Sequence, residues 1–427
     1  MQRYSRNMNT TTPLSIIIPV WNQWHLTRAC LESLRQHTPG DFFEVIVADN
    51  GSGDETAVQL APLGEKLFGR MFRRIRLDTN QGFGPACNLG AKSARGEKLL
   101  FLNNDTLLTS GWLPPLMKAF DEDARLGAAG PLLLYPESDR VQHAGIVFTP
   151  ALRTQHLYAN FPADHPVLRT RRTLQAITGA CLLVPSGLFR QCGGFYEGYK
   201  NGSEDLELCC RIREAGKKLR CVTESRVYHL ESQTPGRGDD DDTNAALLNQ
   251  RCKGCFGPDM HRHAVRDGYR FAITPWLESY ITLAEERETA LTSSMTGAGA
   301  GAGGEFNAAA CWQLLQQEPL WQTGYALLAG FLEQNRLYAE ASGVRLLQTY
   351  FFPMLPHYRQ LAVTAAMAGN ESLAAQAQEK AAHINGLLED VGALTKKAAG
   401  LANWARKAGE QELQHLYEGW LKELGLL

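Results

Sequence analysis

Short apolar runs alternate with amphipathic segments along residues 14–105. The apolar runs are residues 14–20 (LSIIIPV), 42–48 (FFEVIVA) and 98–102 (KLLFL), with a more charged run at 73–77. Runs of this length and composition are typical of strands buried in a parallel sheet. Helices are predicted over 22–37, from about 54, and from about 82 to 94. This β-α-β-α-β-α-β order predicts an α/β domain with a mostly parallel sheet and right-handed crossovers.

Polar side chains follow each of these predicted strands. Asn22 follows the first, Asp49 and Asn50 the second, Asn80 the third and Asp105 the fourth. Ligands of open α/β sheets bind beyond the carboxyl ends of the strands. An acidic residue in that place suits a contact with a nucleobase, as for Asp49, or with a cation on a diphosphate, as for Asp105. Each could equally be a helix N-cap or a turn residue.

The pattern continues less regularly beyond Asp105. A helix is predicted at 112–123 and strand-like runs at 128–134 and 176–184. The segment SEDLEL from Ser203 then opens a helix with acidic residues in its first turn, where the helix dipole favours them. A last strand at 226–229 carries His229 into a loop.

The C-terminal part has a different composition. Residues 295–304 (MTGAGAGAGG) are a Gly/Ala linker, and residues 305–427 have helical periodicity rich in Ala, Leu, Gln and Glu. A common offset of 33 between Tyr325, Leu328 and Ala341 and Tyr358, Leu361 and Ala374 predicts two tetratricopeptide-like helical hairpins. Such repeats bind many kinds of partner, so a protein partner or self-association is expected here. The predicted divisions are a polar segment 1–13, an α/β domain 14–268, a helical connector 269–293, a linker 294–304 and an α-helical domain 305–427.

Composition narrows the class of protein. With 427 residues, two or three domains are expected. The net charge of −2 gives no drive towards nucleic acid, and no nucleic-acid partner is expected. No apolar run approaches the roughly 20 residues that span a bilayer, and the N-terminus lacks a secretory signal pattern. A cytoplasmic location is expected, with peripheral contact at the inner membrane face left open.

Cysteines and charged runs offer fewer signals. The ten cysteines have no framework spacing and predict reduced, buried thiols. Cys252 and Cys255 with His261 and His263 match zinc in number of ligands but not in spacing, so structural thiols are favoured and the metal question stays open. The acidic run 239–242 is interpreted as a solvated loop or helix start.

Eight motifs occur in a characteristic order between Leu14 and Ser232: IIIPVWN, VIVADNGSGDET, NQGFGPACNLG, LLFLNNDT, TGACLLV, GGFYE, SEDLELCCRIREAG and VYHLES. Together they resemble the family 2 glycosyltransferases, and most of all bacterial enzymes of the rhamnosyltransferase and O-antigen type. The resemblance implies a GT-A fold and a sugar donor linked to UDP, dTDP or GDP. It also implies a Mg²⁺ or Mn²⁺ ion and transfer with inversion to a hydroxyl of a glycan, a lipid-linked saccharide or a protein.

The resemblance also implies roles for individual residues. The donor nucleotide is expected on Pro19, Trp21, Asn22, Asp49, Asn50, Asn80, Gly82, Asn88 and Asn104. The metal is expected at Asp105 and His229, the base at Asp205 with Glu204 beside it, and the donor sugar or acceptor near Gly179 and Ala180. These types suit the chemistry, because a metal neutralises a leaving diphosphate and a carboxylate deprotonates an acceptor hydroxyl. One departure is Asn103, which replaces the first acid of the family's DxD motif and leaves it a single charge.

Two other functions stay open. A sugar nucleotidyltransferase also uses an α/β nucleotide domain, but it commonly has a Gly-rich basic loop after the first strand, which PVWNQWH lacks. A non-catalytic scaffold with a degenerate transferase domain is compatible with Asn103. The joint presence of Asp49, Asp105, Asp205 and His229 argues against it.

Overall fold

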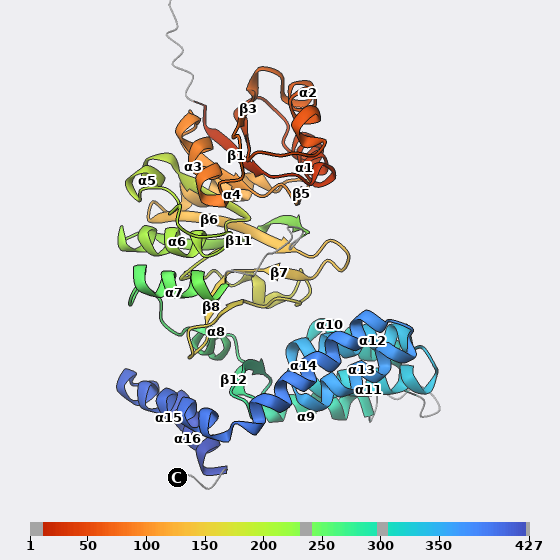
Figure 1. Ribbon diagram of the computed structural model, residues 1–427. Helices are drawn as coiled ribbons and strands as arrows, with labels where there is room; N and C mark the ends of the chain where they lie inside the picture. The colour runs from red at the N-terminus through yellow and green to blue at the C-terminus, as the bar shows by residue number, and fades with distance from the viewer. Residues whose placement is uncertain (1–11, 231–240, 297–305, 424–427) are drawn as a thin grey trace, which may run out of the picture. The chain divides into compact units, whose positions relative to one another are not determined.

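The computed structural model describes residues 12–230, 241–296 and 306–423 (Figure 1). Most of segment 1–13, most of the linker 294–304, and Asp239 and Asp240 of the acidic run lie outside these residues. The chain divides into two compact units. Unit 1 comprises Met1–Val147, Thr154–Ala159 and Leu168–Gly257, and unit 2 comprises Phe148–Arg153, Asn160–Val167 and Pro258–Leu427. Residues 258–268, predicted as part of the α/β domain, therefore group with unit 2.

A mixed sheet of nine described strands forms the centre of unit 1, in the order β3-β2-β1-β4-β10-β6-β11-β5 with β7 beside β6. The strands are β1 (Leu14–Val20), β2 (Phe43–Asp49), β3 (Phe72–Arg76), β4 (Lys98–Leu102), β5 (Thr106–Leu108), β6 (Leu126–Leu134), β7 (Val141–His143), β10 (Cys181–Pro185) and β11 (Lys218–His229). The first four are parallel, and β10 runs antiparallel to both β4 and β6. The predicted mostly parallel α/β sheet is confirmed.

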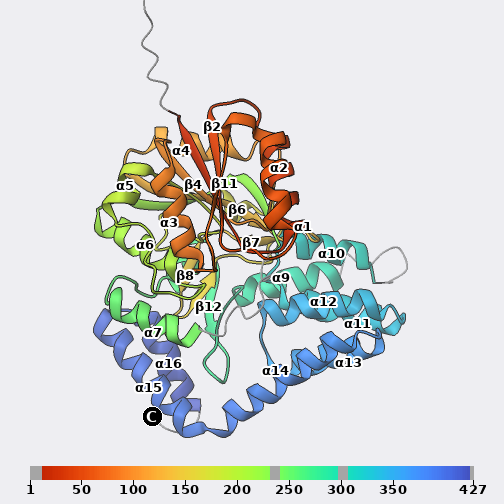
Figure 2. The ribbon, with the colours of Figure 1, turned by 45° about the horizontal axis from the view of Figure 1, so that its top comes forward.

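Helices cover both faces of this sheet (Figure 2). They are α1 (Trp24–His37), α2 (Thr56–Phe68), η1 (Gly69–Met71), α3 (Phe83–Ser93), α4 (Leu113–Glu122), α5 (Ser186–Gln191), α6 (Glu204–Glu214) and α7 (Asp241–Arg251). Successive residues of a strand face opposite sides. Ile16 and Ile18 accordingly pack in one core with Leu31 of α1, whereas Ile17 meets Gly90 of α3 on the other side.

The later strands differ from their prediction. The strand predicted at 226–229 is β11, which runs from Lys218, and the run 176–184 is a strand only from Cys181. The short strands β5 and β7, and the hairpin of β8 (Ile146–Phe148) and β9 (Thr154–His156), were not predicted. Each has three residues, too few to display the two-residue period of a strand.

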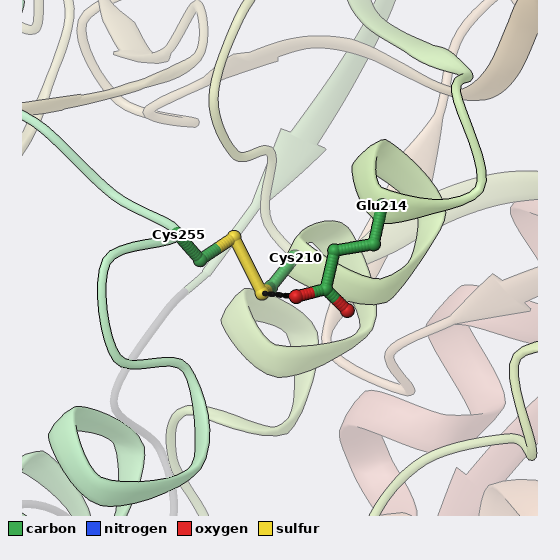
Figure 3. A group of neighbouring side chains, drawn as sticks. All are labelled: Cys210, Glu214 and Cys255. Carbon is green, nitrogen blue, oxygen red and sulfur yellow. Dashed lines mark hydrogen bonds between the residues drawn. A yellow bond between two sulfur atoms is a disulfide. The ribbon is translucent and has the colours of Figure 1, made fainter.

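Cys210 of α6 is disulfide-bonded to Cys255, with 6.0 Å between their Cα atoms (Figure 3). The prediction of reduced thiols is therefore wrong for this pair, whose 45-residue separation in the chain conceals its proximity. The other eight cysteines are free. Burial raises the pKa of Cys30 and Cys209 to about 12, which keeps these thiols protonated. The cytoplasmic location stays a prediction, and the disulfide removes part of its support, which was the expectation that all ten cysteines are reduced.

The short helix η2 (Pro166–Arg169) has its first two residues in unit 2 and its last two in unit 1. Unit 2 also contains α8 (Met260–Arg266), followed by a hairpin of β12 (Arg270–Ile273) and β13 (Ser279–Thr282). The first part of the predicted helical connector is therefore a β-hairpin, and only α9 (Glu285–Thr296) is helical. The remaining helices are α10 (Ala308–Gln317), α11 (Gln322–Gln334), α12 (Tyr338–Phe351), α13 (Leu355–Met367), α14 (Glu371–Glu389), α15 (Val391–Ala408) and α16 (Gln411–Glu423).

The helix bounds agree with the predicted offset of 33 residues. α11 and α13 begin at residues 322 and 355, and α12 and α14 begin at 338 and 371, so both members of the second pair follow the first by 33 residues. Tyr325, Leu328 and Ala341 of the first pair are buried, as are Leu361 and Ala374 of the second. Of the helices that the structure describes, none combines the length and the hydropathy required for a bilayer crossing.

We expect Gly90→Ala to destabilise unit 1, because the added Cβ would lie 2.5 Å from Cγ2 of the buried Ile17. Overpacking of this kind costs about 1–3 kcal/mol. The matched control is Gly187→Ala in α5, where a Cβ meets nothing within 4 Å. Native-state hydrogen exchange of the β1 amides reports on unit 1 alone. Equal protection of β1 in both variants would contradict the expectation.

Candidate active site

A cleft lies beyond the carboxyl ends of β1, β2 and β4. Its lining residues are Pro19, Val20, Trp21, Gln23, Leu26, Asn50, Asn80, Gly82, Phe83, Asn103, Asn104, Asp105, Thr178, Gly179, Ala180, Asn201, Gly202, Glu204 and Asp205. Eleven of the fifteen residues proposed from the sequence are among them. Asn22, Asp49, Asn88 and His229 do not line this cleft. The strand-end rule thus located the cleft, although not every polar residue near it.

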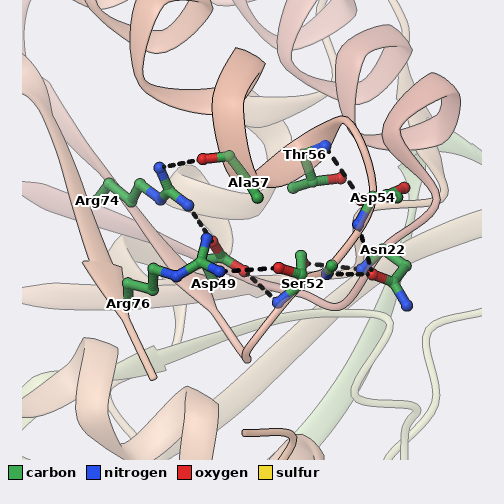
Figure 4. Close-up of polar contacts among 9 residues, drawn as sticks. Asn22, Asp49, Ser52, Asp54, Thr56, Ala57, Arg74 and Arg76 are labelled. Atoms are coloured by element: carbon green, nitrogen blue, oxygen red, sulfur yellow. Dashed lines mark hydrogen bonds and ion pairs between the residues drawn. The ribbon is translucent and has the colours of Figure 1, made fainter. Parts of the chain in front are cut away.

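Asn22 joins two loops at the edge of the cleft (Figure 4). Its side-chain Oδ1 accepts hydrogen bonds from the backbone N–H groups of Gly53 (2.8 Å) and Asp54 (3.3 Å). Its own N–H donates to Oγ of Ser52 (2.8 Å). Asn22 and Gln23 have φ values of 56° and 57°, a left-handed conformation that is costly for such residues. The cross-loop hydrogen bonds offset this cost and fix the path of the chain beside Trp21.

Asp54, in the loop after β2, also bonds the segment that follows β1. Its carboxylate accepts hydrogen bonds from the backbone N–H groups of Trp24 (3.1 Å) and Thr56 (3.0 Å). Burial acts to raise the pKa of Asp54, but these hydrogen bonds prevail and hold it below its ordinary value. The carboxylate therefore stays charged and ties α1 to α2.

Asp49 is completely buried behind this junction. Its carboxylate accepts from the backbone N–H of Ser52 (2.9 Å) and forms ion pairs with Arg74 and, at 3.1 Å, with Arg76. Figure 4 shows both guanidinium groups approaching it from β3. Both carboxylate oxygens are thus engaged within the protein. The contact between Asp49 and a nucleobase stays a prediction.

Asn50 links a second pair of loops. Its Nδ2 donates to Oδ1 of Asn80 (2.8 Å) and to the carbonyl of Gly82 (3.0 Å), and its Oδ1 accepts from the N–H of Gln81 (2.8 Å). Gly82 has a φ of 92°, which favours glycine. The loops after β2 and β3 therefore form one rigid wall. Trp21, 38% exposed, lines the cleft at the same end.

Asn88 has a supporting position rather than a place in the cleft. It donates to the carbonyl of Phe195 (2.8 Å) and to Oε1 of Glu197 (2.9 Å), and it accepts from the N–H of Phe195 (2.9 Å). Gly194 is required beside it, because a Cβ there would lie 2.6 Å from Oδ1 of Asn88. Asn88 thus fixes the start of the segment that reaches the cleft at Asn201.

Three side chains meet at the end of β4 and β11. Oδ1 of Asp105 lies 3.2 Å from Nε2 of His229, and Nδ2 of Asn103 lies 3.5 Å from the same nitrogen. Oδ1 of Asn103 is buried without a hydrogen-bond partner among the described residues. Carboxylate and amide oxygens with imidazole are suitable ligands for Mg²⁺ or Mn²⁺. An orphaned oxygen beside a carboxylate and an imidazole fits a cation.

Gln142 of β7 determines which nitrogen of His229 carries a proton. Nε2 of Gln142 donates to the backbone carbonyl of His229 (3.0 Å), so its Oε1 faces Nδ1 of the ring at 2.7 Å. Nδ1 must therefore donate, which leaves Nε2 of a neutral ring with its lone pair towards Asp105. Two acceptors facing each other at this distance are satisfied by a metal cation or by a proton. Outer hydrogen bonds of this kind commonly orient a metal-binding histidine.

Asp205 lies in the first turn of α6, across the cleft. Its Oδ2 accepts from the N–H of Gly179 and its Oδ1 from the N–H of Leu206, both at 2.8 Å. A Cβ on Gly179 would lie 3.3 Å from Cβ of Asp205, so glycine permits this close approach. Glu204, with 4% exposure, lines the same part of the cleft. One carboxylate is thereby held on rigid backbone donors and presented to the cleft.

The described residues give no support for a zinc site formed by Cys252, Cys255, His261 and His263. Among them, one group of three or more His, Cys, Asp or Glu residues has ligand atoms within 4.8 Å of one another, namely Cys210, Glu214 and Cys255. Its two sulfur atoms are joined in the disulfide (Figure 3) and offer no thiolate. His261 contacts Glu410, and His263 contacts Asp259.

Parts of the chain are similar to known proteins. Residues 15–180 match the family model described as Glycosyl transferase family 2. The O-antigen biosynthesis protein RfbC of Myxococcus xanthus is 31% identical over 228 residues, which are 52% of this chain and 18% of that protein. A PGL/p-HBAD biosynthesis glycosyltransferase of Mycobacterium bovis is 45% identical over 98 residues, which are 22% of this chain and 36% of that protein. The chain thus spans well under half the length of these relatives.

A solved structure, that of GalNAc-T7 with UDP, GalNAc and Mn²⁺, is similar with a TM-score of 0.44 and 21% identity, covering 53% of this chain and 44% of that one. That score is too low to support a conclusion about this chain. The family match and the sheet order are sufficient to confirm the predicted fold class, a GT-A α/β domain followed by an all-α region.

We expect Arg74→Met to destabilise unit 1, because it removes one of the two cations from the fully buried Asp49. Leaving a buried charge without any partner costs about 3–5 kcal/mol, and a smaller loss is expected here because Arg76 still pairs with Asp49. Arg28→Met is the control, since Arg28 pairs with Glu32 on the surface with 60% and 45% of the side chains exposed, where pairs contribute about 0–1 kcal/mol. Hydrogen exchange of the β2 amides measures both, and a loss no greater for Arg74→Met than for Arg28→Met would refute the structural role.

Proposed function

We propose that the chain, whose residues 15–180 match the family model described as Glycosyl transferase family 2, transfers a sugar from a nucleotide-diphosphate donor to an acceptor hydroxyl with inversion at the anomeric carbon. The observation that carries this proposal is that Asp205 lines the same cleft as Asp105, and that Asp105 contacts His229. A carboxylate on one side of the cleft and a cation-binding set on the other are the two parts that such a displacement requires.

The nucleotide is proposed to lie at the end of the cleft formed by Pro19, Trp21, Asn50, Asn80 and Gly82. Trp21 offers an aromatic face to a base. The two loops joined by Asn50 and Asn80 are held by hydrogen bonds within the protein, so little conformational entropy is lost when they contact the ligand. Asn104, held by Thr27 through a hydrogen bond of 2.9 Å, lies next to the proposed cation site.

Asp105, His229 and the buried Oδ1 of Asn103 would hold a divalent cation, Mg²⁺ or Mn²⁺, which neutralises the charge of the leaving diphosphate when bound. His229 is oriented for this by Gln142. Asp105 supplies the one carboxylate of the set.

Asp205 is proposed as the general base. The acceptor oxygen attacks C1 of the sugar, its proton passes to the carboxylate of Asp205, and the bond between C1 and the diphosphate oxygen breaks. Attack from the side opposite the leaving group inverts the configuration. The N–H groups of Gly179 and Leu206 hold the carboxylate in place for this transfer.

The acceptor is proposed to be a saccharide hydroxyl on a glycan or lipid. The relatives' names, O-antigen biosynthesis and PGL/p-HBAD biosynthesis, favour this over a protein acceptor. The helices of unit 2 are proposed to bind a protein partner or a second copy of the chain, as helical repeats commonly do.

We expect Asp205→Asn to retain donor binding and to lose turnover by about 10²–10⁴-fold, the usual contribution of a general base. The control is Asp121→Asn, an exposed carboxylate of α4. Release of nucleoside diphosphate is measured across UDP-, dTDP- and GDP-sugars with Mn²⁺, and donor binding by calorimetry. Wild-type rates for Asp205→Asn would eliminate it as the base. Absence of release from every donor by the wild-type protein would favour a non-catalytic scaffold.

A second expectation concerns Gln142. Gln142→Leu removes the acceptor of Nδ1 of His229 and should weaken Mn²⁺ binding by about 10–100-fold, the usual effect of losing such a partner. Gln59→Leu, at an exposed position of α2, is the control. Electron paramagnetic resonance titration of Mn²⁺ with nucleoside diphosphate present measures binding without turnover. Unchanged affinity in Gln142→Leu would mean that the hydrogen bond between Gln142 and His229 is not needed to hold the ion.

A further inference from the structure

One wall of the cleft, the segment 196–202, is held in place by residues outside the cleft. Its last members, Asn201 and Gly202, line the cleft next to Glu204 and Asp205. We propose that Asn244 and Arg251 of α7, together with Glu207 of α6, are positioning residues that set this wall against the acceptor. The proposal rests on the proposed function, because it takes Asp205 as the base and places the acceptor on the side of the cleft formed by Asn201 and Gly202.

Asn244 forms a reciprocal pair with the backbone of the wall. Its Oδ1 accepts from the N–H of Lys200 (3.2 Å), and its Nδ2 donates to the carbonyl of the same residue (3.0 Å). The side chain is 3% exposed. The buried amide of Asn244 thus satisfies both the N–H and the carbonyl of Lys200, as a neighbouring β-strand would, and fixes the position of that residue.

Glu207 and Arg251 hold the earlier part of the wall. Glu207 accepts from the hydroxyl of Tyr199 (2.8 Å) and from Nε and Nη2 of Arg251 (2.7 and 2.8 Å). The guanidinium of Arg251 also lies over the ring of Tyr196, 3.4 Å from its centroid. Burial acts to raise the pKa of Glu207, but its bonds to Arg251 and Tyr199 prevail and lower it. The carboxylate therefore remains charged, and one ion pair fixes both tyrosines.

The wall requires such support because its own backbone is unfavourable. Asn201 and Ser203 have φ values of 53° and 74°, left-handed conformations that persist only when surrounding contacts enforce them. Ser203 begins α6 without a side-chain capping bond. The helix start thus lacks a side-chain cap, and the contacts from α7 add to the bond between Asn88 and Glu197 in holding the wall.

α7 is in turn fixed to α6. Residues after α7 lead to Cys255, whose disulfide to Cys210 lies one turn beyond Glu207 on α6 (Figure 3). Arg213 adds a hydrogen bond from its guanidinium to the carbonyl of Cys255 (3.0 Å). The helix that carries Asp205 and the helix that holds the wall therefore move as one piece, which keeps the distance between base and acceptor constant.

Two variants test the proposal, each with a control. Asn244→Ala is compared with Asn249→Ala, an exposed residue of the same helix, and Arg251→Gln is compared with Arg28→Gln on α1. We expect the amides of 196–202 to exchange at least tenfold faster in Asn244→Ala and Arg251→Gln than in their controls. Exchange in the loops after β1 and β2 and the affinity for nucleoside diphosphate should stay unchanged.

A second measurement separates positioning from a purely structural role. With the nucleotide-sugar that the wild-type protein hydrolyses, and with a panel of p-nitrophenyl glycosides as acceptors, the ratio of transfer to hydrolysis is determined. Water needs no wall to reach the base, so the ratio should fall at least tenfold in both variants. Faster exchange with an unchanged ratio would overturn the proposal, as would unchanged exchange. If the wild-type protein hydrolyses no donor, the proposed function fails, whereas faster exchange in both variants still supports the role of α7 in holding the wall.

Discussion

The structure of unit 1 depends on how three carboxylates are compensated at one edge of its sheet. Parallel strands bring their carboxyl ends together, and the polar residues that follow them are brought together as well. Asp49 is neutralised by Arg74 and Arg76, and Asp205 by backbone N–H groups at a helix start. Asp105 has a histidine, whose other nitrogen is engaged by Gln142. Each carboxylate thus has a different kind of partner, and this difference is the basis for proposing the cation at Asp105 and the proton transfer at Asp205.

Asparagine side chains hold the irregular segments around these carboxylates. Asn22, Asn50, Asn88 and Asn244 each bond the backbone of a loop that has no regular partner. An amide can donate and accept at once without introducing charge, so it can satisfy such backbone without disturbing the nearby carboxylates. The loops of the cleft are therefore shaped before any ligand binds, which reduces the ordering cost of binding.

The regular half of the domain could be predicted because its signals are local. The bounds of β1 and β4 agree with their apolar runs, and the four strand ends located the cleft. What could not be predicted depends on distant pairing. Asp49 stands at a strand end as Asp105 does, but its contacts with β3 remove it from the cleft. Gln142 precedes His229 by 87 residues on a strand too short to display a pattern, and Cys210 and Cys255 lacked a recognisable spacing.

Asn103 has a consequence for the order in which ligands associate with the proposed site. With an amide in place of an acid, the protein contributes one negative charge to a divalent cation, through Asp105, and the remaining ligands are neutral. A nucleoside diphosphate brings the missing charge, so the cation binds more strongly when the nucleotide is present. Thermodynamic reciprocity then requires the nucleotide to bind more strongly when the cation is present, by the same factor. The amide of Asn103 thereby makes cation and donor depend on each other at the proposed site.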